Sequence, residues 1–249
     1  MLTFRFLSAS FILYAINGVI GFSSEKWPQQ VPNPPLAVLD YGIFQGFINE
    51  TNNWNLFLGI PFAKPPVGTL RWQKPEPPVN LIDQGIINAT VYKSECPQSS
   101  DTGISTGLIT GPSEDCLYMN IYAPPDAQGL PVLFYIHGGG YGQGNGQLDP
   151  TYLESLAPSP FVTVSIQYRL GAFGFLSSDE IARKGVANAG LYDQIDGLEW
   201  VQRYITQFGG DPGNVTIGGI SAGGGSTLMM SMAYGGSLGS TLFSKVIRL

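Results

Sequence analysis

VLFYIHGGG, residues 132–140, joins an apolar run to a loop of consecutive glycines. An apolar run of this length predicts a buried strand. A glycine-rich loop that leaves the end of such a strand can aim bare backbone N–H groups at one point, where they stabilise the oxyanion formed when an ester or amide carbonyl is attacked. The loop therefore predicts acyl-transfer chemistry, with Gly139 and Gly140 as candidate donors.

A serine nucleophile in a G-x-S-x-G pattern would complete this machinery. The pattern occurs at residues 103–107, 219–223 and 235–239. The serine must stand on a sharp turn with a strand before it and a helix after it. Only Ser221 has both, because Val215–Ile217 predicts a short buried strand and Ser226–Ala233 is compatible with a helix. Ser105 lies in a Gly/Ser/Thr loop and Ser237 follows a helix. An ordinary glycine-rich turn remains the alternative for Ser221.

Gly223, Gly224 and Gly225 oppose helix formation, at about 0.8–1 kcal/mol each. Such a run is expected where backbones approach closely or adopt positive φ beside a ligand. The N–H of Ala222, at the start of the following helix, would then join those of Gly139 and Gly140, and the helix dipole would add to the stabilisation.

Further motifs follow in a fixed order along the chain. They are Gly59–Gly68, Leu70–Trp72, Ser113–Asn120, His137–Gly140, Tyr168–Leu176, Asn188–Gln194, Phe208–Pro212 and Val215–Gly225. Over about residues 36 to 247 the chain resembles the type-B carboxylesterase/lipase family, which includes cholinesterases and fungal esterases, and Met232–Gly236 looks most like the fungal members. The resemblance implies an α/β-hydrolase fold, a mostly parallel sheet covered by helices. It also implies a carboxylic ester hydrolase that works through an acyl-enzyme, with Ser221 as nucleophile and Gly139, Gly140 and Ala222 as oxyanion hole.

The same resemblance assigns structural roles to residues outside the site. It pairs Cys96 with Cys116 in a disulfide that closes a loop of about 19 residues, worth on the order of 3 kcal/mol; free thiols are the alternative. In fungal lipases this loop acts as a lid. Two salt bridges, Arg71 with Glu114 and Arg169 with Asp193, would position loops.

Two departures from the family pattern stand out. Ile220 replaces the glutamate that usually precedes the nucleophile, and the chain ends at Leu249. His137, the only histidine, lies on the oxyanion loop, where the family uses it to shape the turn. In this fold the members of the catalytic triad follow in the order Ser, then Asp or Glu, then His. Residues 222–249 contain no Asp, no Glu and no His. We therefore expect residues 23–249 to be the N-terminal part of a catalytic domain, truncated after the nucleophile helix. A catalytically dead cholinesterase-like binding domain and a nonfunctional truncated product are the alternatives.

The composition limits the classes of molecule that the protein can bind. A net charge of −6 and a pI near 4.7 argue against nucleic acid as a binding partner. The expected partner is a small-molecule or lipid ester, and the mechanism calls for no cofactor and no metal.

The first 22 residues predict a secretory signal peptide, with Arg5 ahead of an apolar stretch. A membrane anchor is the alternative, although Asn17-Gly18 interrupts the span, and we expect no stable anchor. We therefore expect the protein to be secreted and extracellular. Asn49 and Asn88 are N-glycosylation acceptors by pattern, whereas Asn214 starts a predicted strand and is expected to be too buried for a glycan.

Strands and helices alternate in the expected architecture. The predicted strands are Leu36–Asp40, Asn55–Gly59, Leu117–Ala123, Val132–Ile136, Phe161–Gln167 and Val215–Ile217. Gln194–Phe208 is the clearest helix, because its apolar residues recur every three or four positions and Gly209 ends it.

Overall fold

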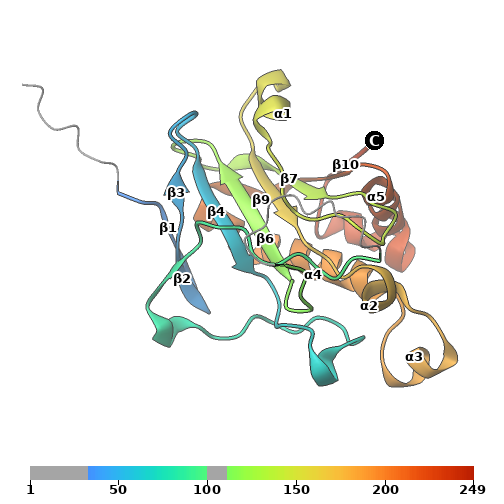
Figure 1. Cartoon of the computed structure of the whole chain (residues 1–249). Coiled ribbons are helices and arrows are strands. Elements are labelled where there is room, and N and C mark those ends of the chain that lie inside the picture. The colour runs from blue at the N-terminus through green and yellow to red at the C-terminus, as the bar shows by residue number, and fades with distance from the viewer. Residues whose placement is uncertain (1–32, 100–110) are drawn as a thin grey trace, which may run out of the picture. The chain divides into compact units, whose positions relative to one another are not determined.

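The computed structural model describes residues 33–99 and 111–249, and residues 34–249 fold as one unit (Figure 1). Its strands are β1 (Leu36–Leu39), β2 (Gly42–Gln45), β3 (Phe47–Ile48), β4 (Asn55–Pro61), β5 (Ile86–Asn88), β6 (Tyr118–Ala123), β7 (Leu130–Ile136), β8 (Val162–Ile166), β9 (Gly210–Gly219) and β10 (Lys245–Arg248). Its α-helices are α1 (Thr151–Leu156), α2 (Gly171–Phe175), α3 (Asp179–Lys184), α4 (Ala189–Tyr204) and α5 (Ala222–Met232). Short 3₁₀ helices cover Gly68–Leu70, Ile82–Gln84, Ile205–Phe208 and Ala233–Ser240.

The described strands form two sheets. A small sheet has the order β1-β2-β5, and the main sheet has the order β10-β9-β7-β8-β6-β4-β3. Strands β10, β9, β7 and β8 pair in parallel, and β6, β4 and β3 continue the sheet with antiparallel pairing. The predicted α/β-hydrolase architecture is confirmed, and its parallel part carries the glycine loop and Ser221.

Every predicted strand is present, with boundaries that differ by a few residues. The largest difference is at Val215–Ile217, which is the centre of the longer β9. The short strands β2, β3, β5 and β10 and the helices α1, α2 and α3 were not predicted, because each is too short to show a hydrophobic period.

The start of the long helix was predicted too late. The helix α4 begins at Ala189, and its last turn tightens into the 3₁₀ helix that ends at Phe208, where Gly209 takes φ 80°. The apolar period begins only at Ile195, because the first turn packs through small residues. A Cβ on Gly190 would lie 2.5 Å from the carbonyl oxygen of Arg169. Periodicity cannot detect a turn that is buried through its backbone.

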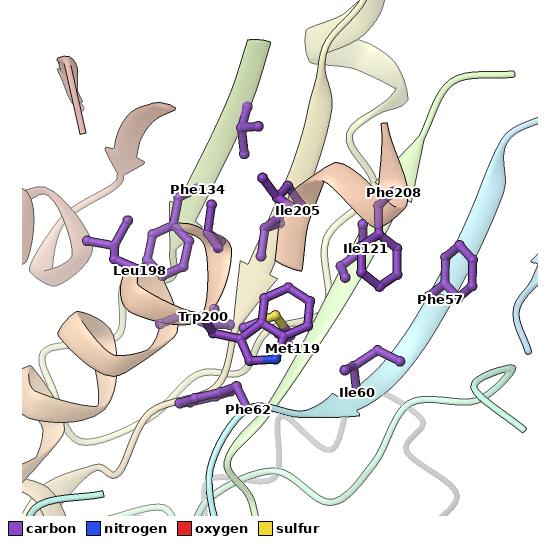
Figure 2. Packing of buried hydrophobic residues seen from close by; sticks show 14 of the residues in the cluster. Phe57, Ile60, Phe62, Met119, Ile121, Phe134, Leu198, Trp200, Ile205 and Phe208 are labelled. Atoms are coloured by element: carbon purple, nitrogen blue, oxygen red, sulfur yellow. The ribbon is translucent and has the colours of Figure 1, made fainter. Parts of the chain in front are cut away.

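The core lies between the main sheet and α4 (Figure 2). Phe134 of β7 and Trp200 of α4 are almost completely buried there. The Phe208 ring meets Phe57 of β4 edge-on, with ring centroids 4.8 Å apart. The indole N–H of Trp200 donates to the Tyr41 hydroxyl at 2.9 Å, so the one polar atom of this large side chain is satisfied. This packing fixes the strands that end at the candidate site.

Within residues 33–99 and 111–249, every helix is too short or too polar to cross a lipid bilayer. The predicted signal peptide lies outside the described residues.

Candidate active site

Ser221 stands at the sharp turn between β9 and α5. Its backbone has φ 56° and ψ −120°, a conformation that is strained for any residue other than glycine, and its side chain is exposed. Close backbone packing requires the glycines on either side. A Cβ on Gly219 would lie 2.5 Å from the carbonyl carbon of Gly223, and one on Gly223 would lie 2.1 Å from the carbonyl oxygen of Ile136. The turn therefore presents the serine hydroxyl to solvent at a fixed point.

The glycine loop packs directly on this turn. Strand β7 pairs in parallel with β9, and Ile136 is opposite Gly219, so both strands end at the same edge of the sheet. A Cβ on Gly138 would lie 2.8 Å from the Ile220 carbonyl oxygen and 3.2 Å from the Ser221 Cβ. Only a glycine allows the loop to approach the serine this closely.

The candidate donors keep their N–H groups available. Gly139 has φ 109° and Gly140 has φ 62°. The Gly139 carbonyl accepts hydrogen bonds from the N–H groups of Gly142 and Gln143, which close the loop into a tight turn. The N–H groups of Gly139 and Gly140 donate to no other described residue. Ala222 is the first residue of α5, where an N–H has no acceptor within the helix.

No base among the described residues contacts the Ser221 hydroxyl. The backbone of Ser221 is tied down, since its N–H donates to the Leu249 carbonyl and its carbonyl accepts from the Gly225 N–H, both at 2.9 Å. Its hydroxyl has no hydrogen-bond partner among residues 33–99 and 111–249.

His137 is buried, and its ring contacts Tyr168 and Gly138. Its ring stacks on Tyr168, with centroids 4.3 Å apart, and its Nδ1 lies 2.8 Å from the Gly138 carbonyl oxygen. The Tyr168 hydroxyl donates to the His137 carbonyl at 2.9 Å. Burial lowers the pKa of His137 to about 4, although the hydrogen bond to the Gly138 carbonyl acts in the opposite direction. A neutral ring held in this way shapes the glycine loop.

Comparison with known proteins agrees with this geometry. The profile of the carboxylesterase family matches residues 33–248. The chain belongs to the carboxylesterase family. The resemblance read from the motifs is therefore confirmed.

Individual relatives of this carboxylesterase-family chain include esterases and lipases. Para-nitrobenzyl esterase of Bacillus subtilis (strain 168) is 42% identical over 194 residues, covering 76% of this chain and 38% of the relative. Secreted lipase 1 of Botryotinia fuckeliana (strain B05.10) is 42% identical over 204 residues, covering 72% and 35%. The solved structure of Aspergillus niger EstA matches with a TM-score of 0.77 and 37% identity, covering 86% and 40%. The chain spans about two fifths of the length of these proteins.

Both ion pairs expected from the family are formed. Arg71 and Glu114 share two hydrogen bonds of 2.6 Å, and the guanidinium also lies over the rings of Trp72 and Phe173. This pair is partly exposed.

The pair of Arg169 with Asp193 is almost completely buried, with 3% and 0% of the side chains exposed. The Nε and Nη2 atoms of Arg169 donate to the Asp193 carboxylate at 2.8 and 2.6 Å. The backbone N–H of Arg169 donates a third hydrogen bond to the same carboxylate. This pair fixes the turn after β8 to helix α4. Both oxygens of the Asp193 carboxylate accept hydrogen bonds from Arg169, which supports its expected structural role.

A disulfide joins Cys96 and Cys116, with Cα atoms 5.0 Å apart, and both residues are fully buried in the core. The residues that follow Cys96 reach the turn after the glycine loop. Sequence reasoning missed the side chain that makes this contact, Gln98, and its position two residues after a cysteine was the only signal that could have found it.

Four further predicted positions lie in the described part of the chain: Ser237, Asn49, Asn88 and Asn214. Ser237 is in the 3₁₀ helix Ala233–Ser240, and its hydroxyl donates to the Tyr234 carbonyl, while Ser105 lies outside the described residues. Asn88 is exposed and Asn49 is partly exposed. Asn214 was predicted to be too buried for a glycan. This residue of β9 is only half-buried, and its side chain accepts a hydrogen bond from Lys245. The side chains of a strand alternate between faces, and that of Asn214 is on the accessible one.

Proposed function

We propose that this chain supplies the nucleophile and the oxyanion hole of a secreted carboxylic ester hydrolase, a serine esterase or lipase. The observation that carries the proposal is the strained, exposed Ser221 with a loop of consecutive glycines packed against it. In this mechanism Ser221 Oγ attacks the ester carbonyl carbon, the alcohol leaves, and water hydrolyses the acyl-enzyme.

The N–H groups of Gly139, Gly140 and Ala222 would stabilise the negative charge on the carbonyl oxygen during each attack. Three features support this role: the positive φ of the two glycines, the lack of an acceptor for their N–H groups among the described residues, and the position of Ala222 at the N-terminus of α5. Donors held in place before the reaction need no reorganisation when charge develops, and one such donor is worth about 10²–10³ in turnover.

The proton of the Ser221 hydroxyl requires a general base. His137 is the only histidine in the 249 residues, and its stacking on Tyr168 and its contact with Gly138 keep it out of this role. The mechanism therefore needs an acid and a histidine that follow Ser221 in the chain, and residues 222–249 contain no Asp, Glu or His. Residues 23–249 would then form the N-terminal part of the catalytic domain.

A binding domain without catalytic activity is the second candidate. The absence of a base and the presence of Ile220, which is 48% exposed beside the nucleophile, favour it. A binding domain, however, has no need of a strained serine or of a glycine loop whose N–H groups have no acceptor among the described residues.

Secretion is part of the proposal. The N-terminal pattern of a signal peptide supports it, and so does the buried disulfide, since disulfides persist in oxidising compartments. Asn49 and Asn88 would carry glycans there. The substrate class is a small-molecule or lipid ester, by analogy with relatives named as esterases and lipases.

The test uses the chain extended by the part of the Bacillus subtilis para-nitrobenzyl esterase that follows its matched region. This extended protein should hydrolyse p-nitrophenyl butyrate. Ser221→Ala should lower kcat by about 10⁴- to 10⁶-fold, whereas Ser237→Ala, in the second described G-x-S-x-G pattern, should leave kcat unchanged. A folded extended protein, checked by circular dichroism, without Ser221-dependent turnover would contradict the proposal.

A further inference from the structure

The Gln98 side chain connects the disulfide to the turn that follows the glycine loop. Its Nε2 donates to the Cys96 carbonyl at 2.7 Å and to the Gly144 carbonyl at 3.1 Å, and its Oε1 accepts from the Gly144 N–H at 2.7 Å. A primary amide has two N–H donors and one carbonyl acceptor. Both donors and the acceptor of Gln98 are therefore engaged, and Gly144 is held at two points.

Gly144 in turn packs on the first residues of the glycine loop. It has φ 109°, and a Cβ at this position would lie 2.5 Å from the His137 Nδ1 and 2.7 Å from the Gly138 carbonyl oxygen. Gly138 itself packs on Ser221. A continuous series of close contacts therefore runs from the Gln98 side chain through Gly144 and Gly138 to the nucleophile.

Neighbouring contacts hold the same two segments together. The Ser99 N–H donates to the Gly142 carbonyl at 2.6 Å. The Asn145 side chain donates to the carboxylate of Glu95 at 3.1 Å, and Glu95 is 5% exposed. The segment 95–99 thus follows the turn 142–145 closely, with the Gln98 amide at its centre.

We propose that Gln98 is a positioning residue that holds the segment Gly138–Gly144 so that its N–H groups face Ser221, with the Cys96–Cys116 disulfide as the anchor. This inference rests on the proposed function for its catalytic consequence. Gln98 contacts no reacting atom. Its effect passes through Gly144, so its loss should misplace the oxyanion donors without changing the surface that binds the ester.

The first experiment measures amide hydrogen exchange by NMR in the 249-residue chain, independently of any activity. The reporters are the Gly142 and Gln143 amides, which donate to the Gly139 carbonyl and not to Gln98. In Gln98→Ala both should exchange at least about tenfold faster, because the turn opens more often. The amides of Phe134 and Val164, in the core strands, should keep their rates.

Two variants guard against a trivial result. Gln98→Glu keeps the size and the acceptor but lacks the N–H donors and points a carboxylate at the Gly144 carbonyl, so it should also accelerate exchange, without leaving a cavity. Gln84→Ala removes an exposed glutamine whose side chain makes no hydrogen bond to a described residue. It should behave as the wild type.

The second experiment introduces the same variants into the extended protein. Gln98→Ala should lower kcat for p-nitrophenyl butyrate by about 10- to 100-fold, with KM within about twofold, because a misplaced donor weakens the transition state more than the ground state. Unchanged exchange at Gly142 and Gln143 in both Gln98 variants would overturn the inference. Faster exchange with an unchanged kcat would overturn it as well. If the wild-type protein shows no Ser221-dependent turnover, the proposed function fails, and the exchange rates alone decide whether Gln98 holds the loop.

Discussion

Strands β7 and β9 are built differently at their two ends. Their central residues, such as Phe134 and Ile217, are fully buried, and Figure 2 shows Phe134 in the core. Their carboxyl ends run into glycines and into the strained Ser221. Burial of apolar surface stabilises the central part of the two strands. Their carboxyl ends depart from regular geometry and expose N–H groups and a hydroxyl. The stabilising core and the proposed site thus lie in adjacent parts of the same two strands.

The largest effect is expected in the buried part. Phe134→Ala should lower the free energy of unfolding by about 3–5 kcal/mol, because a large cavity remains beside Gly197 of α4. Chemical denaturation measures this difference. Tyr152→Ala, at an aromatic residue that is 72% exposed, is the control and should stay within about 0.5 kcal/mol of the wild type. Equal losses of unfolding free energy in the two variants would contradict the expectation that the buried part of the sheet provides the stability.

A pH-dependent effect is expected at His137, between the two regions. Burial lowers its pKa from 6.5 to about 4, so the unfolded chain binds a proton that the folded chain does not between these values. Stability is therefore full above pH 6.5 and falls as the pH drops toward 4, by about 3 kcal/mol in total. His137→Gln should lack this component.

The measurement is the difference between the stability profiles of the wild type and His137→Gln. Burial raises the pKa values of Glu154 and Asp196 to about 7, which gives a dependence of opposite sign, because stability from these groups is lost as the pH rises. Both groups are present in the two proteins, so their contribution cancels. Parallel profiles between pH 4 and 6.5 would show that His137 is not held neutral.

The smallest of these effects is expected at the turn itself. Gly223→Ala places a Cβ 2.1 Å from the Ile136 carbonyl oxygen, and relief of this clash should cost about 1–3 kcal/mol of stability. Gly111→Ala is the matched control, since a Cβ there meets no described atom within 4 Å. Thermal unfolding of the two variants compares them. If Gly223→Ala were as stable as Gly111→Ala, the turn would not depend on close backbone packing.

The sequence predicted the buried part through its pattern. The apolar run ending at Ile136 and the spacing from Ile195 to Phe208 each carry a hydrophobic signal over several residues, and the structure has a strand and a helix there. Boundaries were less certain. The first turn of α4 is buried through Gly190 and polar side chains, which leave no such signal.

The site was predicted by motif and by resemblance rather than by pattern. Gly139, Gly140 and Ser221 could be named because the strand before each segment was predictable and the motifs in order along the chain resemble one family. Gln98 could not be found in this way, because its role depends on contact with Gly144, 46 residues away in the chain. The burial of Arg169 and the partial exposure of Arg71 likewise depend on packing that no motif describes.

We propose that Ser221 and the glycine loop are arranged for attack on an ester and that no described residue acts as their base. The most direct test is the rate at which residues 23–249 hydrolyse p-nitrophenyl butyrate, compared with the same chain carrying Ser221→Ala. The two rates should be equal, because general-base assistance, typically worth about 10²–10⁴-fold, is absent. Turnover that depends on Ser221 and disappears in His137→Gln would contradict the claim and identify His137 as the base.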